Sequence, residues 1–290
     1  MSQSPITGYG TLSSNSQPAP GVDGDDGDVQ PLLQTRRSGI WVPSRLEKWR
    51  SNMMADVRRD WADLILLACY IITGLLDSAS ISTWGSFVSM QTGNTVYFGL
   101  GLAAPHESTR WIKSGTSLGC FCVGSVFFSA LHRVPTSSPK RRWVLCASFV
   151  AQAIFITAAA AILTFGPQTD SATRREAIDW TVLVPIALVA FQSCGQAVAS
   201  RALKYNALTS VVLTSIYCDL FSDAELLSPK NPERNRRVAA PLLLLIGAVL
   251  GGLLARSPVG TAGVLWVAAG MKMIVVFSWL LWPAEKGNDW

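Results

Sequence analysis

The chain has 290 residues, a net charge of +5 and a hydrophobic fraction of 49%. Its length would fit one or two water-soluble domains, but only 15% of its residues are charged and its mean hydropathy is positive. Charged residues avoid several windows of about 20 residues, the length of a helix that spans the bilayer core. The composition excludes an ordinary soluble protein and predicts an all-α, multi-pass membrane protein.

Residues 1–59 are predicted to form a disordered, cytosolic tail, because they are rich in Ser, Pro, Gly and Asp and then become basic. The tail lacks the apolar region of a cleaved signal peptide. Two patterns in it resemble signals that sorting adaptors recognise: a tyrosine pattern at Tyr9–Leu12 and an acidic dileucine pattern at Asp28–Leu33. These patterns favour a vacuolar or endosomal membrane, with the plasma membrane as the alternative.

A transmembrane domain is predicted over residues 60–284, followed by a short tail at 285–290. Six long hydrophobic windows are expected to cross the bilayer, and two shorter, more polar segments lie between them. The long windows are about 61–80, 111–131, 142–165, 181–200, 238–256 and 261–282, and the short segments are 84–103 and 206–221.

The basic loops decide how the short segments are interpreted. If 84–103 crossed completely, the basic loop 132–142 would lie on the side opposite to the basic tail, against the positive-inside tendency. The charge pattern therefore favours six full crossings plus two broken or re-entrant segments, with seven or eight crossings as the alternative. The order crossing, short segment, crossing, crossing then occurs twice, which predicts an inverted three-plus-three repeat. Chance similarity of two Thr-containing apolar segments is the competing explanation.

The first short segment contains the polar run QTGNT, formed by Gln91, Thr92, Gly93, Asn94 and Thr95. Irregular backbone at membrane depth survives only when it is buried in protein or lines a water-filled cavity, and glycine permits a break. The run would then offer donors and acceptors to a bound solute. Alternatively, it is helix-packing glue, in which glycine allows close approach and the polar side chains bond across helices.

Asp77, Asp219 and Lys272 are charged residues within or at the ends of hydrophobic segments. Lys272 is near the middle of the last window, where snorkelling is strained, so an acidic partner or a water-filled cavity is expected. Asp77 and Asp219 are the candidate partners, and all three residues are candidates for ion coupling or a charge pair. The alternatives are interfacial aspartates that contact water or cap a helix, and a tilted last span.

Several uncharged polar residues complete the predicted binding site. Gln192 and Gln196 are four residues apart and form a polar stripe that faces a partner helix or a pore. Thr214 and Ser215 occupy the second short segment, at the position corresponding to the QTGNT run. Gln152 is a lone amide in its window and is interpreted as a packing contact.

Two pairs of glycines have the GxxxG spacing: Gly115 with Gly119, and Gly247 with Gly251. Small residues at this spacing allow helix backbones to approach closely in a membrane. We expect both pairs to be packing contacts.

Two stretches, LLDSAS and FVSMQTGNTVYFGLGLA, resemble the signature of the YoaK-like family, integral membrane proteins classed by a domain of unknown function. The family pattern is kept at Asp77, Phe87, Val88, Thr92, Gly93, Asn94 and Thr95. Gln91 departs from it by standing between Met90 and Thr92, and in TSVVLTSIYCDL Ser215 replaces the glycine of the family's second run. The resemblance covers about residues 61–282 and implies a complete membrane domain of this family, without implying an activity.

These features favour a secondary transporter or permease for a small polar or anionic solute, with a coupling ion. The alternative is a non-transporting scaffold or assembly protein whose polar motifs are packing glue. Enzyme activity, a cofactor and a metal site are not expected, because the chain lacks GxGxxG, P-loop, HExxH and GxSxG motifs and its six cysteines are scattered. Nucleic-acid binding is not expected either, because the basic residues flank hydrophobic segments and suit a lipid bilayer.

Overall fold

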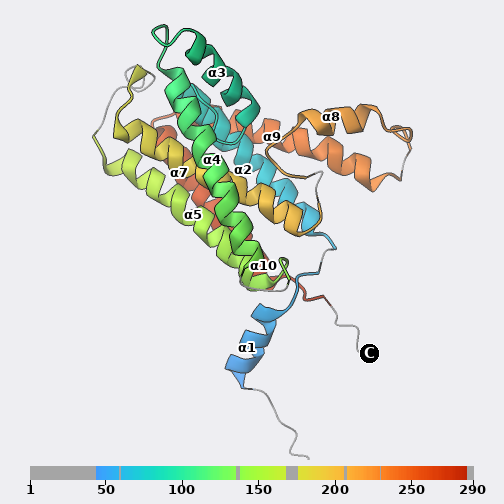
Figure 1. The fold of residues 1–290 in the computed structure, drawn as a ribbon. Coiled ribbons are helices and arrows are strands. Elements are labelled where there is room, and N and C mark those ends of the chain that lie inside the picture. Colours follow the sequence, from blue (N-terminus) through green and yellow to red (C-terminus); the bar gives the residue numbers. More distant parts are fainter. Residues whose placement is uncertain are drawn as a thin grey trace, which may run out of the picture. The chain divides into compact units, whose positions relative to one another are not determined.

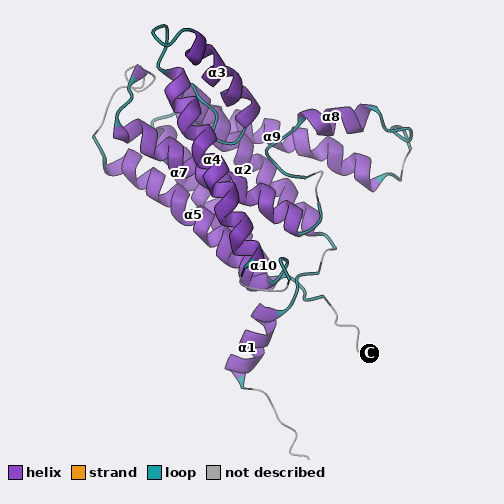
Figure 2. Ribbon diagram, in the orientation of Figure 1, coloured by secondary structure: helices purple, strands orange, loops and turns teal. Residues whose placement is uncertain are grey.

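The computed structural model describes residues 44–58, 60–134, 138–167, 176–205, 208–228 and 230–285, which form helices joined by loops (Figure 1, Figure 2). Both sorting patterns, at Tyr9–Leu12 and Asp28–Leu33, lie outside the described residues. The described helices are α1 Arg45–Met54, α2 Ala62–Trp84, α3 Gln91–Ala103, α4 Arg110–Arg133, α5 Arg142–Phe165, α7 Trp180–Ala202, α8 Thr214–Phe221, α9 Pro232–Arg256 and α10 Gly260–Leu281.

Within the described ranges, six helices are long and apolar enough to cross a membrane: α2, α4, α5, α7, α9 and α10. They coincide with the six windows expected from the sequence, which confirms the predicted fold class. The short helices between them, α3 and α8, have 13 and 8 residues. At a rise of about 1.5 Å per residue they extend about 20 and 12 Å, which is shorter than the bilayer core of about 30 Å.

The six long helices pack in pairs that support the predicted inverted repeat. The most extensive contacts are between α2 and α9, between α4 and α7, and between α5 and α10. The α2–α9 and α4–α7 pairs are parallel, whereas α5 and α10 are antiparallel. Exchanging α2 for α7, α4 for α9 and α5 for α10 converts the α2–α9 pair into the α4–α7 pair and leaves the α5–α10 pair unchanged. This is the relationship expected between two halves of opposite orientation.

Glycines bring α2 and α9 into close contact. A Cβ atom added to Gly247 would overlap the carbonyl oxygen of Ile71, and one added to Gly74 would overlap the carbonyl oxygen of Leu244. A Cβ atom added to Gly251 would overlap the Ser78 hydroxyl and the carbonyl oxygen of Leu75. The predicted packing role of the second GxxxG pair is therefore confirmed. Such close backbone approach is how membrane helices gain van der Waals contact without a hydrophobic driving force.

The first GxxxG pair behaves differently. A Cβ atom at Gly115 would come within 2.9 Å of the Phe98 ring, but one at Gly119 would meet no atom within 4 Å. Only Gly115 is thus a packing contact. The expectation for Gly119 is wrong because its side of α4 has no packed neighbour, which spacing alone does not reveal.

One end of the bundle collects most of the basic residues, and we call it the basic end. It contains the first turns of α2, α5 and α9 and the last turns of α4, α7 and α10. Asp63 of α2 pairs there with Arg236 of α9, at 2.5 Å. The buried Arg142 of α5 donates to the carbonyl oxygen of Asn52 at 2.7 Å and to that of Trp282.

Part of the predicted disordered tail is ordered at this end. Residues 45–54 form α1, which Ser44 and Glu47 begin with a reciprocal capping box. After α1, the N–H of Val57 donates to the carbonyl oxygen of Lys140 at 3.1 Å. Residues 44–58, inside the predicted tail, are therefore ordered here, because these backbone groups gain partners that the folded bundle supplies.

The segment 84–103 enters and leaves the bundle at the end opposite to the basic end. Chain direction reverses after α2 at Gly85, whose φ is 77°, and the Gly85 carbonyl oxygen accepts a bond from Arg110 at the start of α4. α3 then begins beside Ser117, and Gly101 near its other end packs on Trp111. Ser117 lies about 10 Å deeper along α4 than Arg110. The loop 85–90 thus dips into the bundle and α3 returns, as predicted for a re-entrant segment.

Candidate functional site

The side chain of Lys272 is the most unusual charge in the molecule. It lies in the middle of α10 and is completely buried. Its Nζ donates to Oε1 of Gln152 on α5 and to Oε1 of Gln196 on α7, both at 2.5 Å. The ring of Phe149 is 5.1 Å from Nζ, close enough for a cation–π contact.

The two glutamines extend this contact into a network that we call the lysine cluster. Gln196 donates from Nε2 to Thr73 Oγ1 of α2 at 2.9 Å and to Ser210 Oγ at 3.0 Å. Gln152 donates from Nε2 to Ser148 Oγ at 3.3 Å. The cluster, defined as Lys272, Gln152, Gln196, Thr73, Ser148 and Ser210, therefore joins α2, α5, α7, α10 and the loop after α7.

Local sequence explains why Gln152 reaches the lysine. Gln152 and Ser148 are four residues apart and share one face of α5. On the facing helix α7, a Cβ atom at Gly195 would come within 2.6 Å of the Gln152 amide. The absence of a side chain at Gly195 thus leaves room for the Gln152 amide, while the next residue, Gln196, approaches Nζ of Lys272.

Lys272 has no carboxylate partner among the described residues, where the ion pairs lie elsewhere. The expected charge pair with Asp77 or Asp219 is therefore wrong. Two amide oxygens satisfy two of the three ammonium donors but carry only partial negative charge. A buried cation in a bilayer is costly even when it is hydrogen-bonded, and among the described residues Lys272 has no full counter-charge.

Asp77 instead holds the re-entrant loop in place. It is buried near the end of α2 and accepts the backbone N–H of Val88 at 2.9 Å and that of Ser89 at 3.0 Å. The Ser89 hydroxyl also donates to it. A carboxylate with several donors is well satisfied, which is why the loop 85–90 can leave helical geometry inside the bundle.

Asp219, Thr214 and Ser215 all lie on α8, and each is exposed. α8 packs against α9 (Figure 1), and no hydrogen bond joins these three side chains to the described residues of the lysine cluster. The structure therefore does not bring these three predicted residues together with Lys272. A short amphipathic helix and a broken membrane-spanning segment have similar sequences, because both are short and only partly apolar.

The QTGNT run forms a compact hydrogen-bond network. Asn94 accepts the N–H of Phe87 at 3.0 Å and donates to the carbonyl oxygen of Phe87 at 2.8 Å. It also donates to Ser117 Oγ of α4 at 3.0 Å, and Gln91 donates to the same oxygen at 3.2 Å. The two amides thus tie the loop 85–90 and α3 to α4, which is the role of helix-packing glue.

The position of the break also differs from the expected one. Gly93 lies inside the first turn of α3, where a Cβ atom would come within 2.9 Å of the Phe87 ring. The irregular backbone instead covers the loop 85–90, before the QTGNT run. Thr92 and Thr95 are exposed, and the Thr95 hydroxyl donates to the carbonyl oxygen of Gln91 at 2.9 Å.

Of the predicted polar stripe on α7, only Gln196 contacts the lysine. Gln192 is buried and donates to the carbonyl oxygen of Val189 at 3.0 Å, while its own Oε1 has no partner among the described residues. Gln152, interpreted as a packing contact, is a direct partner of Lys272, and Ser148 and Ser210 were missed. The spacing of Ser148 and Gln152 was the available signal, but their partners are far away in sequence.

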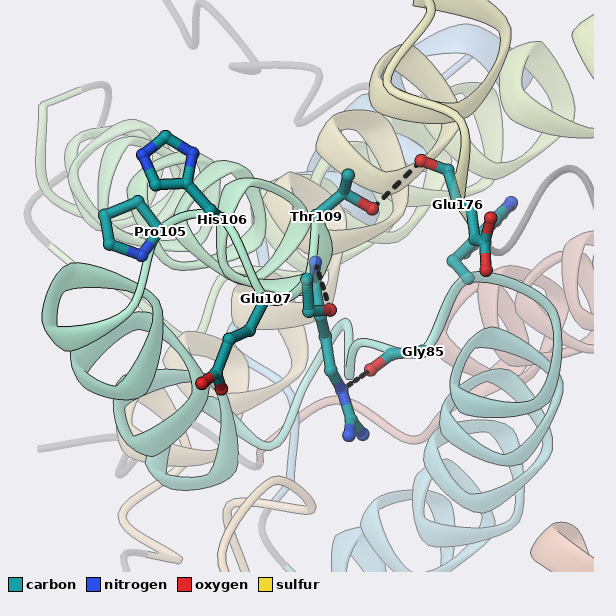
Figure 3. Close-up of a pocket in the computed structure, with 9 residues that line it drawn as sticks. Gly85, Pro105, His106, Glu107, Thr109 and Glu176 are labelled. Atoms are coloured by element: carbon teal, nitrogen blue, oxygen red, sulfur yellow. Dashed lines mark hydrogen bonds between the residues drawn. The ribbon is translucent and has the colours of Figure 1, made fainter.

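A pocket of about 740 Å³ opens at the end opposite to the basic end (Figure 3). His106, Glu107, Arg110 and Glu176 contribute to its lining. Thr109 donates to the carbonyl oxygen of Glu176 at 2.9 Å, and Arg110 lies over the Tyr97 ring. In the described part of the chain, no group of three His, Cys, Asp or Glu residues is arranged to hold a metal ion.

These features define a multi-pass α-helical membrane protein with a buried, amide-bound cation between its helices. The family described as "Protein of unknown function (DUF1275)" matches residues 65–278, and the chain belongs to this family. It is the same family as the YoaK-like one that the sequence resembles. No curated protein and no solved structure matches the chain.

Proposed function

We propose that this protein is a secondary transporter or permease for a small polar or anionic solute, and that the lysine cluster binds the solute. One observation carries the proposal. Lys272 is held by an amide from each predicted half of the molecule, Gln152 from the first and Gln196 from the second. A site whose ligands come from both halves changes whenever the halves move relative to each other.

The chemistry of the cluster suits an anionic group. A carboxylate or similar oxyanion would give Lys272 the full counter-charge that the two amide oxygens do not supply. The amide and hydroxyl groups that surround the lysine could then donate to the same oxyanion. This explains why a cation is kept in a position where an apolar residue would cost less to bury.

The architecture supports movement of two similar units. In the first half, α2 ends before Gly85 and the following loop bonds back to Asp77. In the second half, α7 ends before Lys204, whose φ is 61°, and the following loop bonds back to Gln196 through Ser210. Broken segments at equivalent places in inverted halves are typical of secondary transporters. An ion gradient would provide the energy, with Asp77 as the candidate coupling group.

The proposal also includes the orientation of the protein in the membrane and a role without catalysis. The basic end would face the cytosol, because cytosolic loops carry an excess of Lys and Arg. The protein would act without enzymatic chemistry, and its partners would be the bilayer, the solute and the coupling ion. A non-transporting scaffold is the alternative, and the internally satisfied bonds of Asn94 and Gln91 favour it.

Labelling of cysteines introduced into the lysine cluster distinguishes a transporter from a scaffold, even when the solute is unknown. Ser148→Cys and Ser210→Cys would each be made in a chain whose six native cysteines are replaced by alanine. Both serines are buried in the lysine cluster, and cysteine is nearly the same size. An anionic, membrane-impermeant thiosulfonate would be applied to either face of oriented vesicles. Ala160→Cys is the matched control, because Ala160 is completely buried in the apolar core of α5.

A transporter exposes its site to each side in turn, so both cluster cysteines are expected to react from both sides while Ala160→Cys stays unreactive. Small anions such as acetate, succinate and phosphate would then be screened for their ability to slow the labelling. If the cluster cysteines are as unreactive as Ala160→Cys from both sides, the transport proposal is wrong and the scaffold is favoured.

A further inference from the structure

Another pocket lies at the basic end, between the last turns of α4 and α7, and has a volume of about 310 Å³. Two arginines line it, Arg133 on α4 and Arg201 on α7. Both are exposed, and within the described part of the chain Arg133 donates from Nε alone, to the carbonyl oxygen of Ser129 at 3.2 Å. The pocket therefore combines two positive charges with no carboxylate among its lining residues.

His132 adds a buried hydrogen-bonding side chain to the lining of this pocket. Its side chain lines the pocket and is only 2% exposed. Nδ1 lies 2.9 Å from the carbonyl oxygen of Pro139, which can only accept, so Nδ1 carries the hydrogen of that bond. Nε2 is buried and has no partner among the described residues. In the neutral ring Nε2 is an acceptor, and a buried acceptor without a donor is costly.

An apolar path leads from the pocket along α4 toward the middle of the bilayer. Val123, Val126, Ser129 and Arg133 follow one another at helical spacing on one face of α4. Val123 and Val126 are 62% and 69% exposed, so this face is open to acyl chains. A ligand that fits both parts has an anionic head at the arginines and a hydrocarbon chain along the valines.

We propose that this pocket binds the headgroup of an anionic phospholipid that carries a free hydroxyl, such as phosphatidylglycerol or phosphatidylinositol. Arg133 and Arg201 bind the phosphate, since guanidinium groups match phosphate oxygens. A headgroup hydroxyl donates to Nε2 of His132. Basic pockets between membrane helices are known sites for anionic headgroups. This site is separate from the lysine cluster and does not depend on transport.

Native mass spectrometry of the purified full-length protein would test the assignment. The micelles would contain phosphatidylcholine, phosphatidylglycerol and phosphatidylmethanol, which has the same charge as phosphatidylglycerol but lacks the headgroup hydroxyls. The double variant Arg133→Gln/Arg201→Gln removes both charges. Lys48→Gln/Arg50→Gln, on the exposed α1, is the control for loss of charge. Ala202→Trp fills the pocket and keeps both charges, so it tests the site if the double variant folds poorly.

The wild type and the α1 control are expected to retain phosphatidylglycerol most strongly. The double variant should bind it about 30-fold more weakly, which is about 2 kcal/mol for the loss of two basic residues. Ala202→Trp should also lose retention, because its indole occupies the space of the headgroup. Equal retention by all four proteins would overturn the site. Displacement of the lipid by millimolar inorganic phosphate would show that free phosphate is the ligand, and equal retention of phosphatidylmethanol would refute the role of His132.

Discussion

Replacing Gly247 by alanine tests whether close backbone contact between α2 and α9 stabilises the bundle. The added Cβ atom would overlap the Ile71 carbonyl oxygen and come within 2.8 Å of the carbonyl carbon. Ordinary contact distances begin at 3.4 Å. The neighbour is backbone and cannot rotate away, so the two helices must separate, and the contacts of Gly74 and Gly251 loosen with them.

Overpacking of this kind costs about 1–3 kcal/mol. Gly252→Ala is the matched control, because Gly252 lies on the same helix and a Cβ atom there meets nothing within 4 Å. Both variants gain the same conformational benefit, since alanine is favoured over glycine in a helix by about 1 kcal/mol. That benefit cancels in the comparison, so Gly247→Ala is expected to be about 1–3 kcal/mol less stable than Gly252→Ala.

Unfolding by sodium dodecyl sulfate in mixed micelles, followed by tryptophan fluorescence, measures this difference. A change of about 2 kcal/mol corresponds to a roughly 30-fold change in the unfolding equilibrium constant. Equal stability of the two alanine variants would refute the argument, because α2 and α9 would then not depend on the small residue at their contact.

Three further predictions concern Asp77, Asp223 and the topology of the chain. Asp77→Ala should lower the free energy of unfolding by about 2–4 kcal/mol, because it leaves buried N–H groups unpaired. Asp77→Asn should lower this free energy less. Equal effects of the two substitutions would exclude a loop-holding role for Asp77. The N–H of Glu225, the Asn231 amide and then Arg237 lower the pKa of Asp223, so this stabilisation is present above about pH 4 and is lost as the pH falls through the lowered pKa. Hydrogen exchange in residues 222–231, corrected for intrinsic rate, should therefore rise in acid, and Asp223→Asn should remove that dependence. Cysteines at positions 106 and 140 should react with an impermeant reagent from opposite sides of the membrane; reaction from the same side would refute the six-crossing topology.

The candidate site shows where sequence reasoning stops. The depth of Lys272 followed from its place in the last window, because a charge in an apolar stretch is visible without a structure. Its partners did not follow, because Gln152 and Gln196 come from other helices and meet it only after α5, α7 and α10 pack. The aspartates were the natural guess by charge, but Asp77 is used locally and Asp219 lies on α8.

Hydropathy and charge placement predicted the class of protein, the six helices that are long and apolar enough to cross a membrane, and the return of segment 84–103 to the side it enters. Hydropathy and the placement of basic residues are properties of the chain that no packing can change. Packing of the helices sets the remaining features: the break covers residues 85–90, Asn94 ties α3 to α4, and amides hold Lys272. Each of these depends on hydrogen bonds between distant segments, whose partners are chosen when helices meet.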